Sequence, residues 1–281
     1  IVGFGFKVSA VPFHAWAPDT YEGAPTPVTA FLAVASKSAG FVALINVVFY
    51  CFRLGASGQE ATADVFVPVL FVLSAASMTV GNLIALRQTN VVRMLAYSGI
   101  AQAGFILAPF AVADRNTDAL SAVVTYLVIY AAMNLGAFAV VIAVARKTRS
   151  AEIDSFNGLF QYAPGLTVLM SVFLASFIGI PPIGGWYAKF GVWRALLQAG
   201  GPWGYSLAIL IAINTAIAAG YYLRVARAMW FEPAPDGDVS PVDVPVSLRS
   251  ALAITVVATL VFGVLLGLLT DAASLPAALG R

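Results

Sequence analysis

The stretch SFIGIPPIGGWYAKF, residues 176–190, interrupts the longest apolar segment of the chain, which covers residues 162–199. Proline lacks the N–H that a helix needs and collides with the preceding turn, whereas glycine loosens the backbone. Both residue types gather here: Gly179, Pro181, Pro182, Gly184 and Gly185. We therefore predict a helix that breaks around Pro181 and Pro182. At membrane depth such backbone is tolerated only inside protein or beside water, and broken helices of this kind mark ion or substrate sites in transporters.

The rest of the chain has the composition of a membrane protein. It has 281 residues, of which 60% are hydrophobic and 10% are charged, and its mean hydropathy is +0.90. The charged fraction is less than half of the roughly 25% that is typical of soluble domains. Apolar windows of about 20 residues recur throughout and are continuous rather than alternating, which favours membrane-crossing helices over a barrel. We predict an all-α polytopic membrane protein.

Composition also argues against several classes of function. The net charge of +2 is too small to indicate a nucleic-acid partner. The single cysteine, Cys51, cannot form an internal disulfide, and a thiolate metal site or Fe–S cluster needs several such ligands. The sequence shows no glycine-rich phosphate loop, nucleophile triad or pair of haem ligands. We therefore predict no metal and no cofactor in this chain.

About eight transmembrane helices are predicted, at residues 1–20, 27–52, 65–86, 91–112, 119–145, 162–199, 205–231 and 246–270. The first contains a milder break at Pro12, so two of the eight are expected to be broken. The chain begins at Ile1 rather than at a methionine, and we expect it to be the later part of a longer protein.

The basic residues predict how these helices are oriented. Alternating the eight spans across the membrane places eight basic residues at one end: Arg87, Arg93, Arg146, Lys147, Arg149, Arg224, Arg227 and Arg249. The opposite end receives three: Arg53, Arg115 and Arg281. By the positive-inside rule the first end is cytoplasmic, which places the C-terminus outside.

Three lysines fall inside the predicted spans: Lys7, Lys37 and Lys189. A charged lysine at the bilayer centre costs roughly 2.5–3.5 kcal/mol on insertion scales, so each needs a physical reason. One reason is snorkelling of the side chain to the interface. This suits Lys7 best, because its predicted span is cut at the start of the sequence and the depth of Lys7 in the membrane is therefore not determined. The other is proton exchange by a lysine that lines water. Every Asp and Glu lies at a span end or in a loop, so a carboxylate partner is expected outside this sequence.

His14 is the only histidine, and it follows Lys7 by seven residues. On an uninterrupted helix this spacing would put both on one face, although Pro12 intervenes. Histidine titrates near neutral pH, which suits proton relay, but a structural hydrogen bond explains a lone histidine equally well. Metal binding by His14 is not expected without further ligands.

Uncharged polar side chains form stripes at helical spacing on two of the spans. Their members are Tyr126, Tyr130 and Asn134 on one span and Ser98 and Gln102 on another. Hydrogen bonding between helices and the lining of a water path both account for such stripes, and the sequence leaves these alternatives open.

Four segments resemble the antiporter-like membrane subunits of proton-pumping NADH–quinone oxidoreductase, respiratory complex I. The most specific is FKVSAVPFHAWAPDTYEGAPTPVTAFLAVASKSAG at residues 6–40, whose PDTYEGAPTPVTAFLAVASK portion is most similar to subunit N within that family. The others are VVRMLAYSGIAQAGF at 91–105, GIPPIGGWYAKF at 179–190 and YYLRVARAMWF at 221–231. The resemblance covers essentially the whole chain.

This resemblance implies a fold of fourteen helices with two inverted five-helix repeats, each containing one broken helix. The chain then matches helices seven to fourteen: residues 1–52 end the first repeat, 65–231 form the second, and 246–270 are the C-terminal helix. Lys7, Lys37 and Lys189 match the family's lysines on the seventh, eighth and twelfth helices, and its glutamate on the fifth helix lies outside this sequence. Gln102 stands where many relatives have histidine; glutamine can hold water but cannot take up a proton.

The resemblance further implies a proton-translocating subunit in which the three lysines move protons, with His14 as a candidate relay. Partner subunits would carry FMN, Fe–S clusters and the quinone site. The implied partners are the neighbouring antiporter-like subunit M, the small subunits K, J and A, and the lipids of a bacterial plasma membrane. The alternatives are a Na⁺/H⁺ antiporter of the Mrp type or a membrane hydrogenase subunit, and, in another class, a non-conducting scaffold of the membrane arm.

Overall fold

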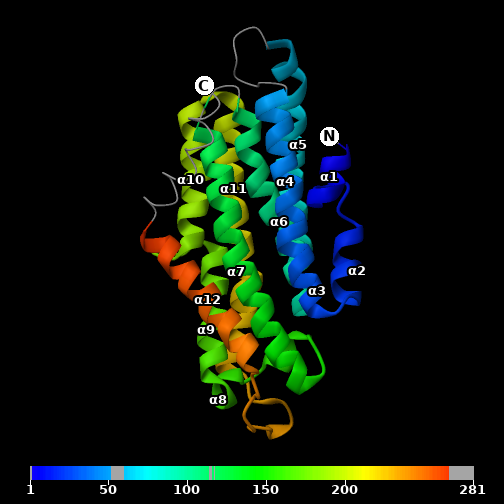
Figure 1. Ribbon diagram of the computed structural model, residues 1–281, viewed down its shortest axis with the longest axis vertical. Coiled ribbons are helices and arrows are strands. Elements are labelled where there is room, and N and C mark those ends of the chain that lie inside the picture. Colours follow the sequence, from blue (N-terminus) through cyan, green and yellow to red (C-terminus); the bar gives the residue numbers. More distant parts are fainter. Residues whose placement is uncertain (1, 52–59, 114–115, 117, 266–281) are drawn as a thin grey trace.

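The computed structural model describes residues 2–51, 60–113, 116 and 118–265, and within these residues the chain is a bundle of helices (Figure 1). The first part contains α1 (Val2–Val8), α2 (Trp16–Gly23), α3 (Thr26–Phe31), η1 (Leu32–Ser36), α4 (Lys37–Ile45), η2 (Asn46–Cys51), α5 (Glu60–Ala85), α6 (Val91–Leu107) and η3 (Ala108–Val112). The second part contains α7 (Asp118–Thr148), η4 (Ile153–Phe156), α8 (Leu159–Tyr162), α9 (Pro164–Ile178), α10 (Gly184–Ala199), α11 (Gly201–Phe231), η5 (Pro235–Gly237) and α12 (Val246–Val264). The elements η1 and η2 are π-helices, and the other η elements are 3₁₀-helices.

The predicted all-α membrane fold is confirmed. In the described ranges, six helical stretches are long and apolar enough to cross a membrane: Thr26–Val48, Val65–Ala85, Val91–Val112, Asp118–Thr148, Gly201–Phe231 and Val246–Gly263. The other two predicted spans are the broken ones, and each is divided between two shorter helices, α1 with α2 and α9 with α10. Parts of the predicted spans lie outside the described residues: Ile1, Phe52 and 266–270.

The break between α9 and α10 forms where the prolines and glycines predict it. Gly179 adopts a φ of +91°, and its N–H closes α9 on the carbonyl oxygens of Ala175 and Ser176, at 3.0 Å each. α10 begins at Gly184, and the N–H of Gly185 donates to Ser176 Oγ at 3.0 Å. Protein groups therefore satisfy backbone donors at the break, as an apolar environment requires.

The break near Pro12 is also confirmed, and it extends over several residues rather than being a kink at one residue. Residues 9–15 form turns between the end of α1 and the start of α2. The N–H of Val11 is satisfied from another helix, because it donates to Ser77 Oγ of α5 at 2.9 Å. Lys7 and His14 consequently do not share one continuous helix, so the seven-residue spacing does not place them on one helical face.

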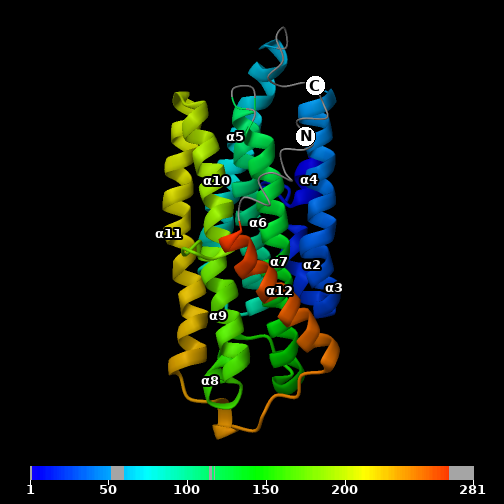
Figure 2. The ribbon, with the colours of Figure 1, turned by 60° about the vertical axis from the view of Figure 1, so that its left-hand side comes forward.

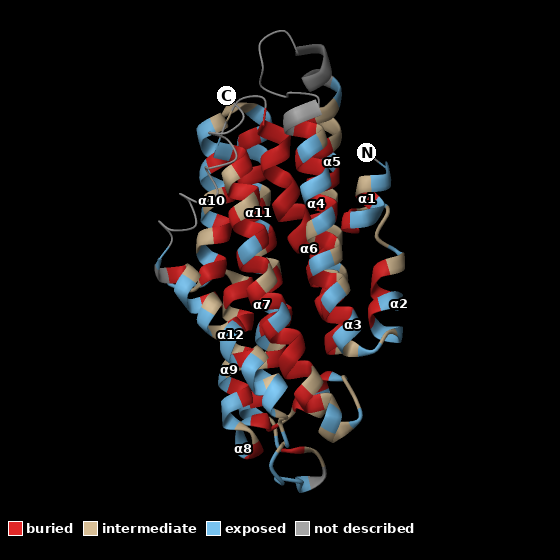
Figure 3. Ribbon diagram, viewed as in Figure 1, coloured by how far each residue is buried: buried red, intermediate tan, exposed pale blue. Residues whose placement is uncertain are grey.

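Helix α6 lies at the centre of the bundle. Of the most apolar 18-residue window within Val91–Val112, 94% of the residues are buried, and Figure 3 shows buried residues along α6 where α4 and α12 have exposed faces. α6 packs against α5 in a hairpin and also contacts α2 and α7. α12 runs obliquely across the bundle and contacts α7, α9 and α10 (Figure 2). The polar side chains of Ser98 and Gln102 on α6 are therefore surrounded by protein.

The connections that carry most of the basic residues meet at one end of the bundle. A β-bridge joins Asn90, before α6, to Glu152, after α7. Lys147 pairs with Asp238 of the α11–α12 connection at 3.3 Å. Hydrogen bonds from Ser240, followed by the contact with Lys147, lower the pKa of Asp238 to about 2, so this carboxylate stays charged at physiological pH. The three basic residues predicted for the opposite end, Arg53, Arg115 and Arg281, lie outside the described residues.

At this end Arg93 of α6 holds α2 in place. Its Nη1 lies 2.7 Å from Asp19 Oδ1 and 2.7 Å from Glu22 Oε2. Because the three side chains are partly exposed, each pair is expected to contribute up to about 1 kcal/mol, less at high salt. We expect Arg93→Ala to lower the thermal unfolding midpoint of the complex slightly, and the difference to shrink in 1 M salt.

Differential scanning fluorimetry of Arg93→Ala, Glu22→Gln and the double variant measures this coupling. A coupling energy that does not decrease as salt is added would contradict the assignment of an exposed ion pair.

Candidate functional site

Lys37 is buried at the centre of the bundle. It begins α4 directly after the π-helix η1, and it is 3% exposed. Its Nζ donates a hydrogen bond of 2.7 Å to the carbonyl oxygen of Gly99 on α6. No carboxylate pairs with Lys37 among the residues that the structure describes. The ammonium group is therefore held by a neutral backbone dipole rather than by an opposite charge.

A buried row of polar groups starts one residue away from this contact. Ser98, next to Gly99 on α6, shares a short hydrogen bond with the hydroxyl of Tyr222 on α11. Gln102 Nε2 donates to Tyr222 Oη at 3.5 Å, and Tyr126 Oη donates to Gln102 Oε1 at 2.5 Å. The structure thus brings together the predicted Ser98, Gln102 and Tyr126, and it adds Tyr222, which sequence reasoning missed.

Lys189 lies at the second break. It is 7% exposed, and its Nζ donates to the carbonyl oxygens of Phe177 and Ile178 at 2.9 and 3.0 Å. These carbonyls end α9, where a helix leaves acceptors unpaired and its dipole favours a cation. Thr215 Oγ1 on α11 lies 3.4 Å from the same Nζ, and the Phe105 ring of α6 lies 4.8 Å away. α6 therefore contacts both buried lysines.

A second polar cluster joins α5 to α11. Asn82 Nδ2 donates to Asn214, to its carbonyl oxygen and to its Oδ1, at 3.1 Å each. Tyr221 Oη donates to Asn82 Oδ1 at 2.9 Å, and Asn214 Nδ2 donates to Thr79 Oγ1 at 3.2 Å. Because the rings of Tyr221 and Tyr222 are 4.3 Å apart, this cluster adjoins the row at Gln102. Sequence reasoning missed Asn82 and Asn214, although isolated amides in apolar spans are a usable signal.

The structure does not bring Lys7 and His14 into this buried row. Lys7 is exposed in the described chain and lies over Gly40 of α4, beside a surface hollow of about 380 Å³. His14 lies in the first break, and its Nδ1 has no hydrogen-bond partner among the described residues. Tyr130 and Asn134 do continue the stripe of α7 and are buried.

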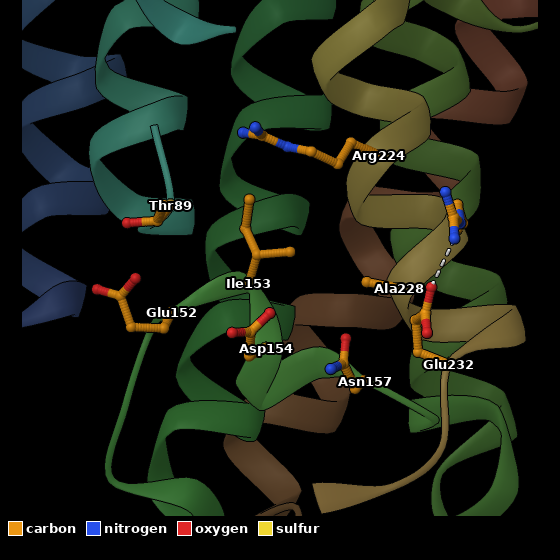
Figure 4. Close-up of a pocket in the computed structure, with 9 residues that line it drawn as sticks. Thr89, Glu152, Ile153, Asp154, Asn157, Arg224, Ala228 and Glu232 are labelled. Atoms are coloured by element: carbon orange, nitrogen blue, oxygen red, sulfur yellow. Dashed lines mark ion pairs between the residues drawn. The ribbon is translucent and has the colours of Figure 1, made fainter. Parts of the chain in front are cut away.

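A polar cavity of about 380 Å³ opens at the basic end (Figure 4). Its charged lining residues are Glu152, Asp154, Arg224, Arg227 and Glu232. Arg227 and Glu232 form an ion pair of 3.0 Å, and the guanidinium of Arg224 donates to the carbonyl oxygens of Leu86 and Gln88. Neither Lys37 nor Lys189 lines this cavity, so it is separate from the buried row.

The fold and the buried lysines can now be compared with known proteins. The sequence pattern of one family, described as NADH:quinone oxidoreductase/Mrp antiporter, transmembrane, matches residues 1–218. This chain belongs to that family. Its relatives in the NADH:quinone oxidoreductase/Mrp antiporter family include subunit N 2 of NADH-quinone oxidoreductase from Sorangium cellulosum, which is 47% identical over 244 residues, covering 86% of this chain and 47% of that protein.

Two solved structures have a helix arrangement similar to that of this chain. A chain of respiratory complex I from Thermus thermophilus is 31% identical with a TM-score of 0.76, over 96% of this chain and 56% of that chain. A chain of the Mrp complex from Dietzia sp. is 20% identical with a TM-score of 0.80. The match covers 96% of this chain and 57% of that chain, and it shows that the fold is shared. This family member spans about half the length of the curated relatives it matches.

Proposed function

We propose that this chain is part of an antiporter-like membrane subunit that carries protons across a membrane while partner subunits oxidise NADH and reduce quinone. The observation that supports it is the position of Lys37, which is 3% exposed and one residue away from a row of hydroxyl and amide groups. A buried lysine is costly in a membrane, and such residues are usually functional. The names of the relatives, subunits N of NADH-quinone oxidoreductase, agree with this proposal.

In the proposed mechanism Lys37 alternates between an ammonium group and a neutral amine. A proton that leaves Lys37 enters this row through water, and the hydroxyls of Tyr222 and Ser98 each accept one proton and pass on their own, so both are neutral before and after the step. Gln102 donates to Tyr222 and accepts from Tyr126, which holds these two hydroxyls in line. Because an amide does not titrate, Gln102 orients the path without storing a charge.

Lys189 is the second residue proposed to bind and release protons, and Lys7 is the third. Lys189 is held at the end of α9, beside the broken segment, where backbone carbonyls orient its Nζ and water can exchange a proton with it. For Lys7, with His14 as a candidate relay, the partner groups are proposed to lie in other parts of the full-length subunit, including a glutamate. The two-repeat organisation, with residues 65–231 as one repeat, is part of the same proposal.

The proposed setting is the membrane arm of a multisubunit complex in a bacterial plasma membrane. FMN, Fe–S clusters and the quinone site are assigned to partner subunits. The direct neighbours are proposed to be subunit M and the small subunits K, J and A, with lipids around them. The end of the bundle that carries Lys147 and Arg227 is assigned to the cytoplasm by the positive-inside rule, and the C-terminus to the outside.

The test is Lys189→Arg, measured as NADH-driven proton uptake and NADH oxidation in inverted vesicles that contain the assembled complex. Arginine keeps the charge and can still bond the carbonyls of Phe177 and Ile178, but it does not deprotonate. We expect both activities to fall at least about tenfold with assembly intact. Lys147→Arg, the same substitution in an ion pair at the basic end, is the control and should be active. Normal pumping by Lys189→Arg would contradict the proposal.

One observation favours a second candidate, a non-conducting scaffold. Lys189 donates to two carbonyls at the end of α9, a role that any retained cation fulfils. In a scaffold, Lys189→Arg should therefore pump normally while Lys189→Met loses assembly. A Na⁺/H⁺ antiporter of the same fold is separated from both by NADH-dependent quinone reduction in the purified complex, which an antiporter lacks.

A further inference from the structure

A glycine on α6 lies between two polar groups of the buried region. A Cβ added at Gly99 would lie 3.1 Å from Tyr130 Oη and 3.2 Å from Lys37 Nζ. Outside the neighbourhood of Gly99 on its own helix, no other described atom lies within 4 Å of that point. Any larger residue at this position would therefore place a carbon atom unusually close to both the ammonium and the hydroxyl, and at least one of the two would have to move away; glycine lets both stay beside α6.

Both polar groups have hydrogen-bonding capacity left. An ammonium group has three donors, and the Gly99 carbonyl takes one of those of Lys37 at 2.7 Å. Tyr130 is 1% exposed, and its Oη has no hydrogen-bond partner among the described residues. Buried hydroxyls in folded proteins nearly always have a partner. Lys37 Nζ and Tyr130 Oη, both with hydrogen-bonding capacity left, therefore lie beside the same point on α6.

The ring of Tyr130 is held independently of its hydroxyl. It meets the Phe177 ring edge to face, with centroids 6.4 Å apart and an interplanar angle of 65°. Phe177 in turn stacks on Tyr222 at 5.4 Å and 9°. This aromatic row, which joins α7, α9 and α11, fixes the position of the Tyr130 hydroxyl. Removing the hydroxyl alone therefore leaves the ring packing in place.

We infer that Tyr130 is the group that exchanges protons with Lys37, and that Gly99 is a positioning residue whose missing side chain lets the two meet, directly or through one water. The inference rests on the proposed function, which it deepens. In the transfer an N–H bond of Lys37 breaks, and Tyr130 Oη accepts that proton and releases its own hydrogen to the next water. The products are a neutral amine and a neutral hydroxyl, and one proton has moved.

The experiment compares Tyr130→Phe, Gly99→Ala and the double variant in inverted vesicles that contain the whole complex. Each single variant is expected to slow NADH-driven proton uptake at least about tenfold, as for loss of an acid–base partner. The double variant should be no slower than the slower single variant, because both changes remove one transfer. The solvent deuterium isotope effect on proton uptake should rise in Tyr130→Phe, a readout that a merely structural defect would not move.

Two matched variants control for the substitutions themselves. Gly191 lies on α10 with open space around its Cβ position, and Tyr205 on α11 is 54% exposed. Gly191→Ala and Tyr205→Phe should therefore pump at the normal rate. If Gly99→Ala fails to assemble, Tyr130→Phe decides the question alone, because it keeps the ring.

The inference is overturned if assembled Tyr130→Phe complexes pump normally with an unchanged isotope effect. It is also overturned if the losses in the rate of proton uptake caused by Tyr130→Phe and by Gly99→Ala multiply in the double variant.

Failure of this inference can be distinguished from failure of the proposed function. If only the inference is wrong, Lys37→Arg is inactive while Tyr130→Phe is active. If the proposed function is wrong, Lys37→Arg itself pumps normally.

Discussion

Replacing Lys37 by arginine is expected to slow NADH-driven proton uptake by about 100-fold or more, as for loss of a group that must both bind and release a proton. Arginine carries the same charge but stays protonated, so the amine that the proposed transfer requires never forms. The effect should exceed that of Lys189→Arg, because Lys37 makes one hydrogen bond, to the Gly99 carbonyl, whereas Lys189 has three acceptors around it. The measurement is the rate of NADH-driven proton uptake, recorded together with the rate of NADH oxidation, with assembly verified by native gel.

A second substitution separates charge from titration at this position. Lys37→Met removes the charge and roughly keeps the volume, and it should be as inactive as Lys37→Arg. If position 37 needed only a cation to bind Gly99, arginine would restore pumping and methionine would not. Active Lys37→Arg with inactive Lys37→Met would therefore support the scaffold and contradict proton transfer.

Replacing Gly185 by alanine is expected to cause the largest loss of stability, in keeping with its place in the second break. The added Cβ would lie 1.7 Å from the carbonyl oxygen of Ser176, a backbone atom that cannot rotate away. Overpacking of a filled interior typically costs 1–3 kcal/mol, and this overlap should reach at least about the upper value. Relief requires the end of α9 to move from the start of α10, which displaces the carbonyls that hold Lys189.

The control is Gly191→Ala on the same helix, where, apart from the adjacent backbone of α10 itself, no atom of the described residues lies within 4 Å of the added Cβ. Alanine is a better helix former than glycine by about 1 kcal/mol, so this variant should be as stable as the parent or more stable. The measurement is the thermal midpoint of the purified complex and its yield. Equal midpoints for Gly185→Ala and Gly191→Ala would contradict the prediction, because they would show that α9 and α10 can move apart at the break without loss of stability.

The positions of the helices and their breaks could be predicted because the forces behind them are local. A run of about 20 apolar residues demands a membrane-crossing helix wherever it occurs, and Pro181 with Gly179 and Gly185 prevents a straight one by steric conflict and backbone freedom. The membrane depth of Lys37 and Lys189 followed from their position within such runs. None of this depends on which helices become neighbours.

The meeting of groups from distant parts of the chain could not be predicted in the same way. Lys37 and Gly99 are 62 residues apart, and Asn82 and Asn214 are 132 apart. Whether two such residues touch depends on the rotation of each helix about its axis and on which faces pack together. An apolar helix buried on most sides gives little periodic signal for that rotation. Tyr222 was missed because its contacts with Ser98 and Gln102 depend on how α11 is rotated against α6, although its sequence segment was recognised.

By itself, the sequence of this protein determined an all-helical membrane fold, two broken helices and lysines within apolar segments, where charge is costly, because each of these follows from side-chain chemistry within one segment. Only the tertiary structure decided that Lys37 has a backbone carbonyl rather than a carboxylate for a partner. It also decided that Lys189 caps the end of α9 and that Gly99 lets Lys37 and Tyr130 both lie beside α6. These contacts arise from helices packing at fixed rotations, and that information lies in the whole bundle rather than in any one stretch.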